Sequence, residues 1–127
     1  MEEVGRNFQV SANAIIRSLE KISVGHDVYI APNSIISAGG GVVLESEVML
    51  GFGSIIVAGN HTCVGGSYRF GPSELKKVHI SFGTWIGANC TIVAGASIPG
   101  GCLIAANSVV VKPIKVSGIY GGSNKIN

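Results

Sequence analysis

Three histidines are the side chains of this 127-residue chain best suited to proton transfer or metal binding. A neutral imidazole can accept a proton near pH 7, and its nitrogens can bind zinc. The histidines are His26, His61 and His79, separated by 35 and 18 residues. No two of them are close enough in the sequence to form a local motif, so any joint chemistry depends on the fold that positions them.

The composition limits the classes of fold that are open to the chain. It is 46% apolar, but only 6% aromatic and 13% charged, and it has 19 glycines. Because an ordinary globular protein has about 25% charged residues, these figures indicate a core of small aliphatic side chains with little charged surface. No apolar run reaches the roughly 18 residues of a membrane span. The acidic start, Met1-Glu2-Glu3, does not resemble a signal peptide.

The charge and the cysteines indicate the partners and the compartment. A formal net charge of +2 with dispersed basic residues is weak support for nucleic-acid binding, so none is expected. The odd number of cysteines, without a signal peptide, favours a reducing cytoplasm. Cys90 and Cys102 are interpreted as buried fillers, and Cys63 as a loop residue; together they form no CxxC motif.

A six-residue repeat predicts the fold that positions these side chains. Aliphatic residues recur at steps of six, with two-residue shifts near residues 19–21 and 39–41 and one large gap after Ile56. The sixteen positions are Val4, Val10, Ile16, Val24, Ile30, Ile36, Leu44, Leu50, Ile56, Ile80, Ile86, Ile92, Ile98, Ile104, Val110 and Val116. A period of six is neither the 3.6 of an α-helix nor the 2 of a simple strand. Hexapeptide repeats are typical of a parallel β-helix, in which three short strands and three corners close one coil.

We therefore expect one all-β domain over residues 1–127, a parallel β-helix of about five triangular coils. The coils are predicted at residues 4–23, 24–43, 44–61, 80–97 and 98–115, followed by a tail over residues 116–127. Small residues four positions after each aliphatic would face the tight turns, and glycine or asparagine would supply positive φ at the corners. Residues 62–79 interrupt the repeat and predict an extruded loop, which in a compact fold is often functional.

The repeat resembles the left-handed β-helix hexapeptide acyltransferases. Residues 80–100, ISFGTWIGANCTIVAGASIPG, are similar to that family's IGxxVWIGxxxxIxxGVxIG. Residues 103–114, LIAANSVVVKPI, are similar to VIGAGSVVTKDI, and residues 121–126, GGSNKI, match GNPAKVI more weakly. The 24-residue spacing from His61 to Trp85 is similar to that of the sugar O-acetyltransferases, including the galactoside and maltose acetyltransferases.

This resemblance implies transfer of an acetyl group from acetyl-CoA to a hydroxyl of a sugar or surface-polysaccharide precursor, with no metal. His61, in the turn Gly59-Asn60-His61, falls on the histidine that removes the hydroxyl proton. Attack on the thioester builds negative charge on its oxygen, which needs a fixed donor. By the resemblance, that donor is the backbone N–H of Ala88.

The resemblance also implies the CoA site. Trp85 and Gly87 belong to the Trp-Ile-Gly motif, and Trp85 would line the pantetheine channel. Ala106 would contact the pantetheine arm through its backbone. Val111 and Lys112 match a Thr-Lys or Thr-Arg pair near the adenosine end, so Lys112 would meet a CoA phosphate, while Val111 lacks the hydroxyl of the family's threonine.

The acceptor side matches the family less completely. Asn33 falls on an asparagine that binds the acceptor sugar, but Gly41 stands where the galactoside enzymes have a carboxylate. This departure disfavours a galactoside or maltose acceptor, and the Gly39–Gly41 turn is more similar to acetyltransferases of O-antigen, capsule and sialic-acid pathways. The family also implies a homotrimer with the active site between neighbouring chains.

Plainer interpretations remain open. His61 and Asn33 could be simple corner residues, Lys112 a surface lysine, and Trp85 a cover for one coil. The whole chain could be a non-catalytic β-helix that acts as a scaffold or binding module. Three histidines in this fold also raise the zinc-binding γ-class carbonic anhydrases, but those need two histidines close together in the chain.

Overall fold

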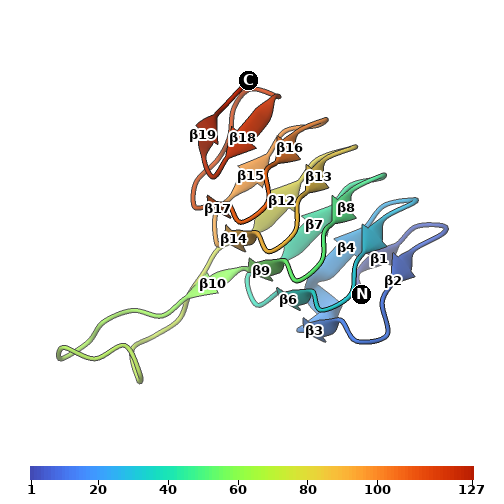
Figure 1. The fold of residues 1–127 in the computed structure, drawn as a ribbon. Helices are drawn as coiled ribbons and strands as arrows, with labels where there is room; N and C mark the ends of the chain where they lie inside the picture. The colour runs from blue at the N-terminus through green and yellow to red at the C-terminus, as the bar shows by residue number, and fades with distance from the viewer.

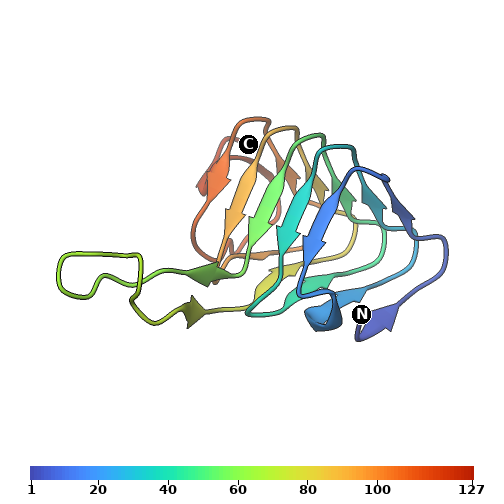
Figure 2. The ribbon, with the colours of Figure 1, turned by 90° about the horizontal axis from the view of Figure 1, so that it is seen from below.

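A computed structural model describes all residues, 1–127, as a stack of coils built from short strands. Figure 1 shows the strands of successive coils side by side along one axis, and Figure 2 shows the stack turned by 90°. Three sheets form the sides of the stack, and we call them sheets A, B and C in the order in which the chain visits them. The predicted all-β fold, a parallel β-helix with one extruded loop, is confirmed.

The sheets are parallel ladders whose strands come from successive coils. Sheet A contains β1 (Glu3–Val4), β4 (Ile22–Val24), β7 (Val42–Leu44), β12 (Val78–Ile80) and β15 (Ser97–Ile98). Sheet B contains β2 (Gln9–Val10), β5 (Tyr29–Ile30), β8 (Met49–Leu50), β13 (Trp85–Ile86), β16 (Leu103–Ile104) and β18 (Ile119–Gly121), with β19 (Asn124–Lys125) antiparallel to β18. Sheet C contains β3 (Ile15–Arg17), β6 (Ile35–Ser37), β9 (Ile55–Val57), β14 (Thr91–Val93) and β17 (Val109–Val110).

The six-residue repeat forms the core because its aliphatics stack in register. In sheet C, Ile36 pairs with Ile56, which is followed by Ile92 and Val110, and all four are at most 1% exposed. A single aliphatic column of this kind runs along each sheet. Burying such side chains contributes about 1.5–3 kcal/mol each. The narrow interior explains why the chain uses few aromatic residues.

Interior hydroxyls satisfy backbone groups where the coils turn. Ser54 is fully buried, donates through Oγ to the carbonyl of Gly87 at 2.7 Å, and accepts from the N–H of Cys90 at 3.1 Å. Thr84 makes the same kind of contacts with Pro99 and Cys102 one coil further on. Each hydroxyl therefore replaces water for polar groups that the core would otherwise leave unpaired.

Two predicted boundaries are wrong. The extruded segment ends earlier than residue 79, because Val78 and Ile80 belong to β12 and are fully buried. The residues after 115 are more than a tail, because β18 pairs with β16 and begins a sixth coil. There Tyr120, 5% exposed, stacks opposite Ile104, whereas Val116, predicted in the aliphatic column, is 59% exposed. The cause is the spacing from Ile104 to Tyr120, which is sixteen residues instead of the eighteen of a full coil and shifts the repeat by two positions.

The extruded segment is a β-hairpin arm over residues 58–77. Its stem pairs β10 (Gly59–Asn60) with β11 (Glu74–Leu75), antiparallel to each other. Figures 1 and 2 both show the arm extending away from the stack at the corner between sheets C and A. The two-residue excess near residue 20 forms the 3₁₀ turn η1 (Leu19–Lys21) at the same corner. The helical content is limited to this short turn, and the structure contains no helix that could span a bilayer.

Candidate active site

His61 lies at the base of the arm, immediately after β10, and its side chain is exposed. Its ring makes no hydrogen bond within the chain, unlike the rings of His26 and His79. It lines two pockets. One, of about 350 Å³, continues along the edge of sheet C, and the other, of about 670 Å³, lies under the arm beside Tyr68 and Arg69. A free imidazole facing open space is able to accept a proton from a bound ligand.

The stem of the arm fixes the position of His61. Asn60 pairs with Glu74 in the antiparallel ladder, and the carboxylate of Glu74 lies 3.1 Å from Nζ of Lys76. The hydroxyl of Thr62, the residue after His61, donates to the carbonyl of Pro72 across the stem. The chain is therefore tied on both sides of His61.

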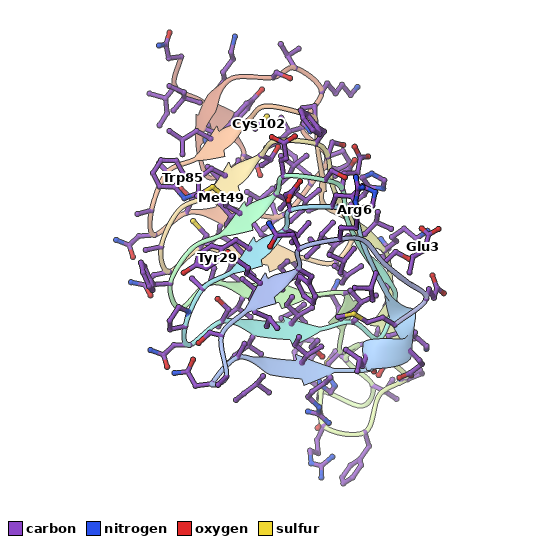
Figure 3. All side chains as sticks on the ribbon, turned by 90° about the vertical axis from the view of Figure 1, so that its right-hand side faces the viewer. Glu3, Arg6, Tyr29, Met49, Trp85 and Cys102 are labelled. Atoms are coloured by element: carbon purple, nitrogen blue, oxygen red, sulfur yellow. The ribbon has the colours of Figure 1, made fainter.

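Trp85 lies far from His61 within one chain. It is 49% exposed on the outer face of sheet B, between Met49 and Leu103 of the neighbouring coils. Figure 3 shows Tyr29, Met49 and Trp85 along one side of the stack. Sheet B is the side of the triangle opposite the corner from which the arm leaves, so a single chain does not bring Trp85 and His61 together.

Packing between coils explains why isoleucine and glycine follow Trp85 in the Trp-Ile-Gly motif. Ile86 fills the core, and the next coil passes directly over Gly87. A Cβ at Gly87 would lie 2.7 Å from the carbonyl oxygen of Ile104 and 2.8 Å from the backbone nitrogen of Ala106. Only glycine allows the two coils to approach this closely.

Ala88 and Ala106 occupy the same position of the corner between sheets B and C, one coil apart. Neither N–H donates a hydrogen bond within the chain. Phe52 has the same free N–H one coil earlier, so this is a property of the corner position. The corner therefore presents a row of unpaired donors close to Trp85, as an oxyanion or a pantetheine amide requires.

The other predicted site residues are divided between corners. Asn33 lies at the corner between sheets B and C with φ of 63°, where its Oδ1 accepts from Asn13 at 2.7 Å, and it does not line a pocket with His61. Val111 and Lys112 are exposed directly after β17, toward the corner between sheets C and A. The N–H of Val111 donates to Ser123 at 3.2 Å.

The backbone conformation at position 41 explains why this position holds a glycine and not a residue with a carboxylate. Its φ is 94°, a conformation that strains any L side chain. The Cε atom of Lys77 lies 3.6 Å from the place of a Cβ on Gly41, and the pocket beside Gly41 is lined by Lys21 and Lys77 together with Glu2.

Sequence reasoning missed the side chains that share the first pocket with His61. Its polar lining consists of Arg17, Ser18, Ser37, Asn60, His61 and Ser73. Arg17 and Ser37 face outward at the end of β3 and β6, in register with Val57 of β9. The 20-residue spacing of positions 17, 37 and 57 follows from the coil length, so this stack could have been found from the sequence.

No metal centre is formed by these residues. His26 accepts the N–H of Arg6 at one corner, and His79 contacts Glu45 on the outer face of sheet A. No group of three or more His, Cys, Asp or Glu side chains could hold a metal ion. Cys90 and Cys102 are buried as predicted, and burial raises the pKa of the Cys90 thiol, whereas Cys63 is exposed in the arm.

The pair of Glu45 and His79 makes stability depend on pH. The hydrogen bond from His79 Nε2 to Glu45, at 2.5 Å, lowers the pKa of this carboxyl, and the N–H of Phe82 at 3.0 Å lowers it further. At pH values above the ordinary glutamate pKa of about 4.3, the lowered pKa of Glu45 stabilises the fold. This stabilisation is lost as the pH falls through the folded-state pKa.

Glu45→Gln is therefore expected to flatten the acid side of the stability profile. Urea unfolding between about pH 6 and about pH 3 should show wild type losing more of its free energy of unfolding than the variant, by a small amount because both side chains are partly exposed. Parallel losses in the two proteins would show that the pair does not contribute.

Solved structures of acetyltransferases share this fold. The hexapeptide-repeat acetyltransferase VCA0836 of Vibrio cholerae, solved with acetyl-CoA, superposes with a TM-score of 0.89 at 22% identity and covers 97% of this chain and 67% of its own. A maltose O-acetyltransferase from Clostridium difficile superposes with a TM-score of 0.86 at 25% identity, over 92% of this chain and 63% of its own. The resemblance to hexapeptide-repeat acyltransferases is thus confirmed by the structure.

Sequence relatives carry similar names. The Saccharomyces cerevisiae protein YJL218W, an acetyltransferase by name, is 27% identical over 121 residues, which are 94% of this chain. A macrolide acetyltransferase by name from Lysinibacillus sphaericus is 51% identical over 39 residues, which are 31% of this chain and 22% of that protein. The chain spans 51% of the length of the yeast protein. No family model matches the chain.

Proposed function

We propose that this chain transfers an acetyl group from acetyl-CoA to a hydroxyl of a sugar or surface-polysaccharide precursor, with His61 as the general base. The observation that carries the proposal is the unpaired imidazole of His61 at the mouth of two pockets, on a scaffold that elsewhere presents unpaired N–H groups beside an exposed tryptophan. The names of the relatives support acetyl transfer from CoA. A cytoplasmic location remains part of this proposal.

His61 and Ala88 would divide the chemistry. His61 accepts the proton of the acceptor hydroxyl as its oxygen bonds to the thioester carbon. The N–H of Ala88 stabilises the negative charge on the thioester oxygen. When the carbon–sulfur bond breaks, the imidazolium returns its proton to the departing sulfur, so the products are the ester and free CoA. Trp85 and the backbone of Ala106 would hold the pantetheine arm, with Lys112 near a phosphate.

A homotrimer would assemble this site from two chains. His61 and Trp85 lie on opposite sides of one triangle, so they can meet only if the arm of one copy reaches sheet B of the next. The outer faces of sheets B and C support such contacts because they are largely apolar, whereas sheet A is mostly polar. The apolar outward residues are Tyr29, Met49, Trp85, Leu103 and Ile119 on sheet B, and Ile15, Ile35, Ile55 and Val109 on sheet C, while Gln9 on sheet B and Arg17, Ser37 and Thr91 on sheet C are polar. Closed symmetric packing would bury these rows.

Mixing two inactive variants tests the shared site. We expect His61→Ala and Trp85→Ala to be impaired separately, and their refolded equimolar mixture to recover activity, because a mixed trimer has one interface with both native residues. Random mixing restores about a quarter of the sites. Thiol release from acetyl-CoA with a panel of hydroxyl acceptors measures the recovery.

Two controls complete this test. Mixing His61→Ala with wild type checks that refolding itself preserves activity. No recovery from two variants that each form trimers would contradict a shared site. A wild-type chain that neither binds acetyl-CoA nor releases thiol would instead favour the scaffold or binding-module alternative.

A further inference from the structure

The pocket that runs from His61 along the edge of sheet C is basic. Its lining contains Arg17 and no carboxylate, and its remaining polar groups are serine hydroxyls and the amide of Asn60. The pocket under the arm adds Arg69, with Glu74 as its one acidic residue. Since Glu74 lies 3.1 Å from Lys76, its charge is already paired.

Arg17 is available to a ligand. Its side chain is exposed, and its guanidinium makes neither an ion pair nor a hydrogen bond in the chain. Lys21, nearby at the same corner, is instead held by the carbonyl of Gly39 at 3.0 Å. Arg69 lies over the ring of Phe70 with its centre 4.7 Å from the ring centroid, and it too has no acidic partner. An unpaired guanidinium in a pocket is suited to binding a carboxylate or phosphate.

The outward side chains at the ends of the sheet C strands form a column that changes from polar to apolar beside His61. Arg17 and Ser37 lie on one side, in the first two coils, while Val57, Val93 and then Val111 continue the column in the later coils. The apolar end suits the pantetheine arm of a donor that lies between this edge and sheet B of a neighbouring copy. The polar end, two strand spacings or about 10 Å from Arg17 to the level of Val57, has room for one sugar ring with an attached anion.

Basic residues are concentrated at this edge of the molecule. Six of the nine lysines and arginines stand at the end of sheet C or in the corner segments between sheets C and A, compared with three of the seven acidic residues, Glu2, Glu20 and Glu74. The basic residues are Arg17, Lys21, Arg69, Lys76, Lys77 and Lys112. Such an edge attracts anions toward His61.

We propose that the acceptor is an anionic hydroxyl compound, a sugar carrying a carboxylate or a phosphate, and that Arg17 binds its anion. The hydroxyl of Ser37 lies between Arg17 and His61 and bonds the ring, which turns one hydroxyl toward the imidazole. This inference rests on the proposed function, because it assigns the acceptor half of the same site. Arg17 is a specificity-determining residue that touches the acceptor and takes no proton.

Matched acceptors test the proposal. The probes are methyl glucoside, methyl glucuronide and glucose 1-phosphate, which differ in charge and in the position of the anion. We expect kcat/KM to be at least about tenfold higher for one of the anionic sugars, as a charge-assisted contact provides. Comparing methyl glucuronide with glucose 1-phosphate shows whether a carboxylate or a phosphate is preferred. A neutral sugar used as well as both anionic sugars would overturn the inference and leave the proposed function intact.

Arg17 variants locate the anion. Arg17→Gln should raise the KM for the preferred anionic sugar about tenfold or more, leave the KM for acetyl-CoA unchanged, and abolish the preference over methyl glucoside. Arg17→Lys should restore part of the preference, and Arg6→Gln, at a different corner, should have no effect. A rise in the KM for acetyl-CoA instead would show that Arg17 holds a donor phosphate and would overturn the assignment.

Binding without turnover separates this inference from the proposed function. Saturation-transfer NMR with the same three sugars reports binding even if no ester forms. Preferential binding of an anionic sugar that is lost in Arg17→Gln but kept in Arg6→Gln would support the anion site even in a chain that transfers no acetyl group. Equal binding of all three sugars, or binding insensitive to Arg17→Gln, would refute it.

Discussion

Replacing His61 with alanine is expected to lower kcat for acetyl transfer by about a hundredfold to ten-thousandfold, the usual contribution of a general base. An alcohol is a weak nucleophile at neutral pH, and the ring of His61 is the unpaired imidazole that lines both pockets. Its removal should leave donor binding intact, because Trp85 and Ala106 lie elsewhere on the fold. Thiol release under saturating acetyl-CoA measures the effect.

His26→Ala is the matched control for this prediction. His26 is also exposed, but it lies at a different corner, where its Nδ1 accepts the N–H of Arg6 at 2.7 Å. This variant should keep wild-type kcat. Quenching of Trp85 fluorescence by CoA should be the same in wild type and His61→Ala. Comparable turnover in wild type and His61→Ala would remove His61 from the mechanism.

Gly87→Ala should destabilise the fold by about 1–3 kcal/mol, the usual cost of forcing extra atoms into a packed interior. The added Cβ would meet the backbone of Ile104 and Ala106 at 2.7 and 2.8 Å, and backbone atoms in a continuous ladder cannot rotate away as a side chain can. Sheet B would have to open between β13 and β16. Urea unfolding at fixed protein concentration measures the loss, since assembly makes stability depend on concentration.

Gly39→Ala provides the comparison. A Cβ there would meet only Cδ2 of Leu75, at 3.3 Å, and the φ of Gly39 is not in the left-handed region. Because a leucine side chain can shift by a few tenths of an ångström, this variant should unfold close to wild type. Equal stability of Gly87→Ala and Gly39→Ala would show that the coils separate without cost.

The core could be predicted from the sequence because one rule generates it. A step of six places each aliphatic on the inner side of a short strand, and parallel stacking brings residues of the same type into register, as for Ile56 and Ile92. The rule failed for Val116 and Tyr120 at the C-terminal end. There the spacing is two residues shorter and puts a tyrosine into the column, but Val116 still fits the step of six after Val110, so the pattern gave no sign of the change.

The site could be predicted only in part, since its members do not share a period. His61 was placed by its position beside the interruption, and the structure shows its imidazole unpaired at two pockets. The spacing of His61 and Trp85 suggested one site, whereas a triangular coil separates them, because distance along the chain does not report which side of a triangle a residue occupies. Arg17 has no motif, and it becomes visible only when coils are aligned by their ladders.

The arm interrupts the sequence but not the ladders around it. Val42 pairs with Ile22 at a separation of 20 residues on one side and with Val78 at a separation of 36 on the other. Closing a loop of nearly twice the length costs only about 0.6 kcal/mol in chain entropy. The segment beside His61 can therefore lengthen, shorten or be exchanged at little expense to folding, so the proposed acceptor pocket is free to diversify while the scaffold proposed for the donor stays unchanged.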